Sequence, residues 1–265
     1  MTASIGIARR HRALAALPVV VAAVVTPLLL RPAAGQEDDD ALLAEGRELY
    51  ETGCSSCHGP DGLGVVAPDG SARGPSLENA GEAAAYFYLS TGRMPLANSE
   101  EQPRRKEPAY DDEEMAALVA YVGTLGDGPA IPEVDTTGAD LATGGEIYRE
   151  DCQACHSASG SGGALSYGRA APGLADATAT EVGAAVRVGP GQMPVFGPET
   201  ISDEELNDLA AYVEYLRSPE DPGGLPIGRT GPIPEGFVAW LIGMVALLAL
   251  VAWIGTRMPI RRRES

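Results

Sequence analysis

The five-residue pattern Cys-x-x-Cys-His constrains this 265-residue chain more than any other feature, and the chain contains it twice. The pattern attaches a c-type haem: both cysteines form thioethers with the haem vinyl groups, and the adjacent histidine reaches the iron. The four cysteines of the motifs are the only ones in the chain. We therefore predict two covalently bound haem c groups, each with its iron, held by Cys54, Cys57 and His58, and by Cys152, Cys155 and His156.

Paired cysteines also occur in redox-active disulfides and in zinc sites. Zinc needs further ligands, and outside the two motifs the chain has no cysteine and only one histidine, His11. The histidine that directly follows each motif's second cysteine also argues against both alternatives. Aromatic residues make up only 5% of the chain, with three Phe, which fits domains whose cores are completed by haem.

Charge is unevenly distributed along the chain. Four of the 19 basic residues lie within residues 1–35 and four within residues 257–265, whereas all but one of the 37 acidic residues lie between these ends. Residues 36–256 therefore carry a formal charge of −25. This acidity argues against nucleic acid as a partner. It leaves open a basic protein partner or a simple role in solubility.

The two motifs belong to an internal repeat. A spacing of 98 residues separates three matching pairs: Gly46 and Gly144, Tyr50 and Tyr148, and Cys54 and Cys152. Features that recur in register within one chain indicate two domains of the same fold. Apolar periodicity predicts three helices in each copy, at residues 41–52, 83–91 and 110–125, and at residues 141–151, 178–188 and 202–217.

Polar segments separate these helices. Residues 37–40 are expected to be an acidic linker, residues 59–81 and 157–173 loops, and residues 97–110 a long surface loop with a basic tip. The first and last helices of each copy are expected to cross at a glycine, with a tyrosine filling the gap beside it. The predicted pairs are Gly46 with Tyr121, and Gly144 with Tyr212.

Each iron needs a sixth ligand, and methionine is the usual partner of histidine in cytochromes c. Met94 and Met193 lie in matching Met-Pro pairs, 36 and 37 residues after His58 and His156. The other four methionines lie at the start, in the C-terminal part, or in a helix without a counterpart. We expect Met94 and Met193 to be iron ligands; the alternative is that they are ordinary core or surface residues.

The second ring nitrogen of a ligating histidine is normally held by an acceptor. The matching Pro-x-Leu loops offer the carbonyls of Pro75 and Pro172 as acceptors, although these prolines could simply shape a turn. Arg93 precedes Met94 and either contacts a haem propionate or is solvated. Because Gln192 holds the matching place in the second copy, we expect a solvated Arg93. No catalytic residue is expected.

Both ends of the chain contain apolar segments. Residues 13–30 follow a basic run and precede small residues, a pattern of a cleaved signal peptide or an uncleaved signal anchor. Residues 237–256 contain no charge and can span the roughly 30 Å apolar layer of a membrane. The arginines that follow this segment predict a cytoplasmic C-terminus and haem domains on the outer side.

Each copy resembles a class I cytochrome c, with a Gly- and Tyr-containing helix, Cys-x-x-Cys-His, Pro-x-Leu, Met-Pro and a closing helix near Ala-Tyr-Val. This resemblance implies an all-α fold with two tandem class I cytochrome c domains plus a C-terminal transmembrane helix. The predicted boundaries are a signal peptide or signal anchor at residues 1–35, the first domain at 36–126, a linker at 127–138, the second domain at 139–218, a linker at 219–235, the transmembrane helix at 236–256 and a basic tail at 257–265.

The whole arrangement, with Arg93-Met94-Pro95 and the long basic loop after it, is similar to the dihaem cytochrome c subunit of the actinobacterial quinol–cytochrome c reductase, the cytochrome bc complex. The resemblance implies a plasma-membrane subunit of an oxidoreductase. It would take electrons from the Rieske iron–sulfur subunit and pass them to a haem–copper oxidase, beside the cytochrome b subunit. The rivals are an electron-transfer subunit of another dehydrogenase or oxidase, a dihaem peroxidase and a haem sensor module.

Overall fold

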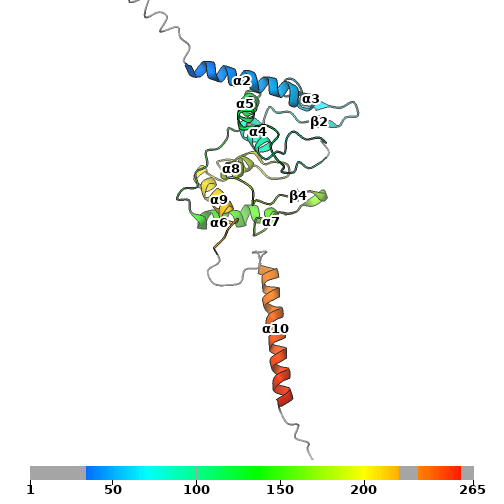
Figure 1. Ribbon diagram of the computed structural model, residues 1–265, viewed down its shortest axis with the longest axis vertical. Helices are drawn as coiled ribbons and strands as arrows, with labels where there is room; N and C mark the ends of the chain where they lie inside the picture. The colour runs from blue at the N-terminus through cyan, green and yellow to red at the C-terminus, as the bar shows by residue number, and fades with distance from the viewer. Residues whose placement is uncertain (1–33, 99–100, 221–231, 258–265) are drawn as a thin grey trace, which may run out of the picture.

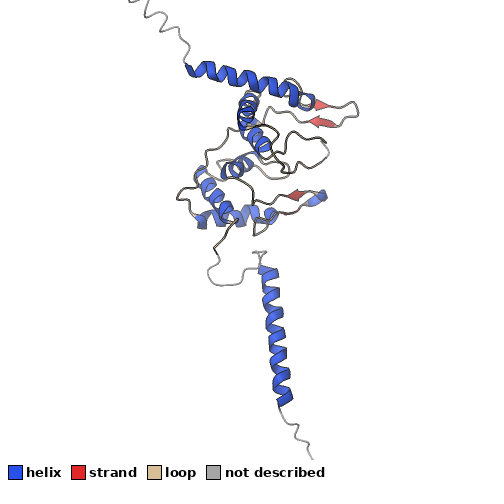
Figure 2. Ribbon diagram, viewed as in Figure 1, coloured by secondary structure: helices blue, strands red, loops and turns tan. Residues whose placement is uncertain are grey.

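The computed structural model describes residues 34–98, 101–220 and 232–257. The predicted signal peptide or signal anchor, residues 1–35, lies almost wholly outside the described residues, and so does most of the basic tail. The described part is mostly helical, with two pairs of very short strands (Figure 2). This agrees with the predicted all-α class.

The first repeat is built from four helices and one small hairpin. Its elements are α2 (Ala34–Gly53), α3 (Ser55–His58), β1 (Val65–Val66), β2 (Ala72–Gly74), α4 (Gly81–Ser90) and α5 (Asp112–Gly123). A capping box begins α5: the Asp111 side chain accepts from the Glu114 amide, and the Glu114 side chain accepts from the Asp111 amide. Residues 37–40, predicted as a linker, instead belong to α2, where acids near a helix N-terminus are favourable.

The second repeat follows the same order. Its elements are α6 (Leu141–Ile147), the π-helical turn η1 (Tyr148–Cys152), α7 (Gln153–His156), β3 (Gly163–Ala164), the 3-10 turn η2 (Ser166–Gly168), β4 (Ala170–Ala171), α8 (Ala179–Val188) and α9 (Asp203–Tyr215). Capping boxes begin α8 and α9. The predicted loops therefore each contain a minimal antiparallel pair, β1 with β2 and β3 with β4.

The long helices of each repeat cross at a glycine, as predicted. A β-carbon on Gly46 would lie 2.0 Å from the carbonyl oxygen of Ala117 in α5, and one on Gly144 would lie 2.0 Å from that of Asp208 in α9. Tyrosine rings pack beside both crossings, with centroids 5.3 Å and 5.5 Å apart for Tyr50–Tyr121 and Tyr148–Tyr212. Because glycine has no β-carbon, the helix that leads into each Cys-x-x-Cys-His motif can touch the closing helix of the same repeat.

Each repeat has its own apolar core, and a smaller cluster joins the two. The first core surrounds Tyr50 and Leu118, and the second surrounds Tyr148 and Leu206. In the joining cluster, Phe87 and Ala83 of α4 pack against Ala184 of α8. Figure 1 shows α4 and α8 side by side where the two repeats meet. The repeats therefore pack directly against one another.

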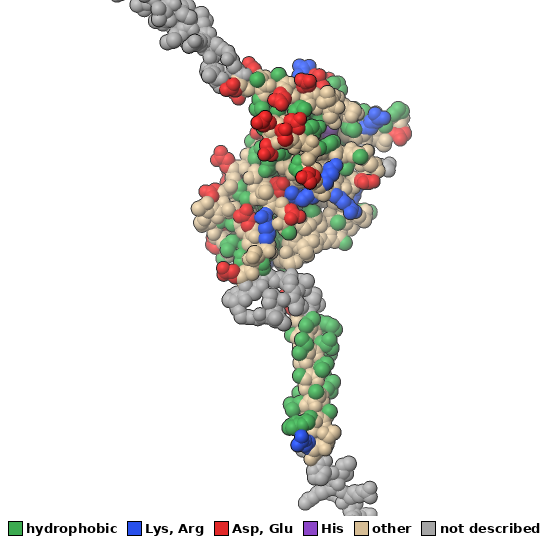
Figure 3. Space-filling model, viewed as in Figure 1, with side chains coloured by type: hydrophobic (Ala, Val, Ile, Leu, Met, Phe, Trp, Pro, Cys, Tyr) green, Lys and Arg blue, Asp and Glu red, His purple; other side chains and the backbone are tan. Residues whose placement is uncertain are grey.

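The last described element is the long helix α10 (Pro232–Arg257). Residues 235–257 have a mean hydropathy of 2.6 in their most apolar window, and none of that window is buried in the protein. Hydrophobic side chains cover this helix in Figure 3. A 23-residue apolar helix is long enough to cross a membrane, so α10 fits the predicted role of a membrane anchor.

Candidate haem-binding sites

The first Cys-x-x-Cys-His motif forms its own short helix directly after α2. The amide of Cys54 donates to the Tyr50 carbonyl at 2.9 Å, and the amide of His58 donates to the Cys54 carbonyl at 3.0 Å. Residues three apart on a helix face the same side, so the thiols of Cys54 and Cys57 can reach one ring. The next residue, Gly59, has a φ of +80° and turns the chain away.

Each motif histidine is held by the carbonyl that the sequence predicted. His58 Nδ1 lies 2.9 Å from the Pro75 oxygen, and His156 Nδ1 lies 2.9 Å from the Pro172 oxygen. A carbonyl only accepts, so Nδ1 must carry the proton in both rings. The other nitrogen, Nε2, keeps its lone pair and is free to ligate a metal.

A buried tyrosine fixes the residue that follows each histidine. The hydroxyl of Tyr50 donates to the Gly59 carbonyl at 2.7 Å, and that of Tyr148 donates to the Ser157 carbonyl at 2.7 Å. Both side chains are fully buried. Burial, with a smaller contribution from Cys54, raises the pKa of Tyr50 to about 12, so this hydroxyl remains a donor at neutral pH.

Burial also favours the protonated form of the first cysteine in each motif. It raises the pKa of Cys152 to about 12, with Asp151 adding to the effect, and it raises the pKa of Cys54. Zinc binds the thiolate, whereas a thioether carries no charge and tolerates burial. No disulfide joins the four cysteines, and the described residues contain no group of three His, Cys, Asp or Glu placed to hold a metal ion. The motifs therefore suit thioether attachment better than zinc or a disulfide.

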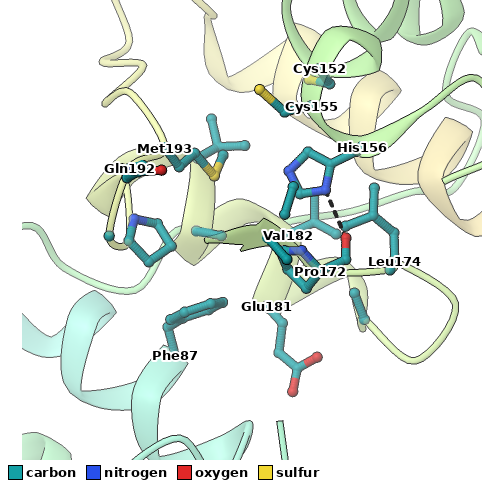
Figure 4. Close-up of a pocket in the computed structure, with 18 of the residues that line it drawn as sticks. Phe87, Cys152, Cys155, His156, Pro172, Leu174, Glu181, Val182, Gln192 and Met193 are labelled. Carbon is teal, nitrogen blue, oxygen red and sulfur yellow. Dashed lines mark hydrogen bonds between the residues drawn. The ribbon is translucent and has the colours of Figure 1, made fainter. Parts of the chain in front are cut away.

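The two predicted methionines each pack on the core of their own repeat. Met94 contacts the first core and Met193 the second. The amide of Met94 donates to the Tyr88 carbonyl at 3.0 Å, which ties this segment to α4. Figure 4 shows the Met193 thioether and the His156 ring facing each other across a pocket in the second repeat. This arrangement fits the prediction that both side chains bind the same iron.

The pocket of the second repeat has a volume of about 680 Å³. Its lining is mainly apolar and includes Leu174, Val182 and Phe196, in addition to the motif residues and Met193. This volume lies within the usual range for cofactor sites. Two thiols on one side, an imidazole and a thioether facing each other, and apolar walls together fit a haem c.

The first repeat supplies one wall of this second pocket. Phe87 and Tyr88 of α4, Arg93, and residues 102–105 line it together with the second repeat. The Gln102 side chain pairs with the backbone of Ala170, accepting from its amide at 3.0 Å and donating to its carbonyl at 2.6 Å. Ala170 lies two residues before Pro172, so the first repeat helps to hold the loop that positions His156.

One sequence prediction is therefore wrong. Arg93 is not solvated but only 8% exposed, with its guanidinium carbon 4.9 Å from the centroid of the Phe87 ring. Residues 101–110 form the predicted loop with an exposed basic tip, but Arg105 in this loop also pairs with Glu181, a 4% exposed residue of α8. Arg93 and Arg105 both lie where the two repeats pack together, which a comparison of one repeat with the other does not predict.

Three other residues of the pocket lining, Phe87, Gln102 and Glu181, were not anticipated as site residues. The available signal was the basic run Arg104-Arg105-Lys106 in a strongly acidic segment, within a loop that the second copy lacks. An insertion with opposite charge to its surroundings indicates a contact with another part of the molecule.

Both repeats match known protein families. Residues 43–126 match the family described as cytochrome c. Residues 139–213 match the family described as cytochrome c oxidase, cbb3-type, subunit III. The structure and these matches agree that the chain contains two cytochrome c domains, which carry covalently bound haem c.

Curated relatives match most of the chain. The cytochrome bc1 complex cytochrome c subunit of Mycobacterium tuberculosis (strain H37Rv) is 43% identical over 229 residues, which cover 83% of this chain and 80% of the relative. Subunits of the same name from Mycobacterium leprae and Corynebacterium diphtheriae are 42% and 37% identical, over 83% and 84% of this chain and 78% and 83% of theirs. The chain therefore belongs to the family of cytochrome c subunits of the cytochrome bc1 complex.

Proposed function

We propose that this chain binds two haem c groups and passes electrons from the Rieske iron–sulfur subunit to a haem–copper oxidase. The observation that carries the proposal is that the Cys-x-x-Cys-His motif occurs twice, and in each copy the motif histidine is held at 2.9 Å by a proline carbonyl. Two sites of the same design in one chain suit a relay rather than a single reaction centre.

The ligand residues have distinct roles in this proposal. Cys54 and Cys57, and likewise the cysteines of the second motif, hold the haem covalently. His58 and His156 would ligate the iron through Nε2, and Met94 and Met193 would supply its other protein ligand. A haem with histidine and methionine ligands exchanges single electrons, and the soft thioether raises its reduction potential. With both ligands in place, the histidine and the methionine would keep small molecules from the iron.

The orientation in the membrane follows from the C-terminal helix and its flanks. The span of α10 ends at Arg257, and further arginines follow at positions 261–263. Positive residues favour the cytoplasmic side, so we place the C-terminus there and both haem domains outside the plasma membrane. This side would expose residues 36–126 and 139–218, as two class I cytochrome c domains, to the Rieske and cytochrome b subunits and to the oxidase.

Replacing the second methionine tests the relay. Met193→Ala removes a proposed iron ligand, and we expect quinol-driven oxygen consumption by membranes to be largely lost while covalent haem is retained. Met115→Ala is the matched control, because Met115 packs on the first core and belongs to neither predicted ligand set. Full turnover of Met193→Ala membranes would show that the second haem lies off the electron path.

A further inference from the structure

Arg93 is a buried cation without a complete set of partners. It lies after α4 with 8% of its surface exposed, stacked on the Phe87 ring. Its Nη1 is buried and makes no hydrogen bond to any part of the chain that the structure describes. A buried charged donor that is left unpaired is costly, and such an atom calls for an acceptor that is present in the assembled protein.

Glu181, the acid that interacts electrostatically with Arg93, already has other partners. Glu181 pairs with Arg105, accepts from the Thr178 amide at 2.9 Å, and receives the Ser90 hydroxyl at 3.4 Å. Burial lowers the pKa of Arg93, and the positive charge of Arg105 lowers it further, while Glu181 opposes both effects. The side chains that surround Arg93 therefore do not compensate its charge fully.

The position of Arg93 relates it to the second motif. It lines the pocket that contains Cys152, Cys155 and His156. In Figure 4 the two cysteines lie on one side of this pocket, and Phe87, on which Arg93 stacks, lies on the opposite side. The propionates of a haem leave from the ring edge opposite the vinyl groups. A haem tethered to these cysteines therefore turns its propionate edge toward Phe87 and Arg93.

The charges around the pocket agree with this orientation. The lining contains four arginines (Arg93, Arg104, Arg105 and Arg169) and two acids (Asp151 and Glu181). The arginines therefore exceed the acids by two positive charges. A haem brings two propionate groups. Arginine binds carboxylates through paired, charge-assisted hydrogen bonds, which are stronger than bonds between neutral groups.

We propose that Arg93 of the first repeat binds a propionate of the haem attached to the second repeat. The proposal rests on the proposed function only in requiring haem c at Cys152 and Cys155. Arg93 is then a positioning residue that acts across the domain interface, directly beside the proposed ligand Met94 of the other haem. A fixed positive charge near a haem favours its reduced state, so Arg93 raises the reduction potential of the second haem.

The test measures the potential of each haem separately in the full-length chain in detergent. Cys54→Ala/Cys57→Ala leaves only the second haem, and Cys152→Ala/Cys155→Ala leaves only the first. Into each background we introduce Arg93→Gln and titrate the haem spectroelectrochemically. Loss of one charge in a partly screened site is expected to change the reduction equilibrium on the order of tenfold. For one electron, that factor lowers the potential by about 59 mV.

The expected result is a lower potential for the second haem and an unchanged potential for the first. Arg93→Lys, which keeps the charge, should leave the potential of the second haem close to its original value. Arg47→Gln, which removes an exposed arginine from α2, should cause no shift. Arg93→Met, which keeps the contact with Phe87, serves as a second uncharged variant. Unchanged potential of the second haem, or an equal shift of both, overturns the proposal. Absence of covalent haem from the second motif in the unaltered protein would instead overturn the proposed function.

Discussion

At the scale of single residues, one buried tyrosine in each repeat secures the segment around the motif histidine. Tyr148 is fully buried and donates to the carbonyl of Ser157, the residue that follows His156. His156 in turn donates to the carbonyl of Pro172. Two hydrogen bonds thus fix the backbone and the ring of this histidine, and Tyr50 and Pro75 do the same in the first repeat.

Tyr148→Phe is expected to lower the free energy of unfolding by about 1 kcal/mol, because it removes one donor and leaves the Ser157 carbonyl unpaired. For a chain of this size, that corresponds to a fall of about 2 to 4 °C in the thermal unfolding midpoint, followed by circular dichroism. The control is Tyr167→Phe, at a tyrosine that is 96% exposed. Equal midpoints for the two variants would contradict this role of the tyrosine.

At the scale of secondary-structure elements, the fold depends on the close crossing of two helices in each repeat. At Gly144, α6 approaches α9 so closely that a β-carbon would lie 2.0 Å from the Asp208 carbonyl oxygen. That oxygen belongs to the backbone and cannot rotate away. A larger residue would therefore push apart the helix that leads into the second motif and the helix that closes the domain.

Gly144→Ala should consequently destabilise the protein by about 1 to 3 kcal/mol, the usual cost of overpacking a tight contact. The same thermal unfolding measurement detects this loss. Gly243→Ala is a suitable control, since Gly243 is also helical but an added β-carbon meets nothing within 4 Å. A stable Gly144→Ala variant would show that α6 and α9 can separate without loss.

Sequence periodicity predicted the structure that forms within each repeat. It did not predict the contacts that form when the two repeats pack together. The helices, the glycine crossings and the carbonyl of Pro172 follow from short-range pattern and from recurrence in register. Arg93 was predicted to be solvated because Gln192 holds the equivalent place. The two repeats are not equivalent once they pack together, because α4 and the long loop of the first repeat line the pocket of the second.

At the scale of the whole molecule, the two repeats are joined by an apolar contact and by a polar clamp. Phe87 of α4 packs against α8, while Arg105 pairs with Glu181 and Gln102 pairs with Ala170. Glu181 is 4% exposed, whereas the side chain of Arg105 is 32% exposed. The clamp therefore joins a buried acid of one repeat to a half-buried base of the other.

Glu181→Gln breaks this ion pair while keeping the shape of the side chain. We expect a loss of about 1 to 2 kcal/mol, below the value for a fully buried pair because Arg105 keeps contact with water. Glu51→Gln breaks the exposed pair between Arg47 and Glu51 on α2 and should leave the unfolding midpoint unchanged. If both substitutions had the same effect, the clamp would contribute no more than a surface ion pair.

The central claim is that one chain holds two haem groups, each with a histidine and a methionine as axial ligands. Electron paramagnetic resonance of the oxidised full-length protein tests this most directly, because it counts ferric haems and separates their spin states. We predict two low-spin ferric signals of equal intensity per chain. A single low-spin signal, or a high-spin signal in the resting protein, would contradict the assignment of Met94 and Met193 as ligands.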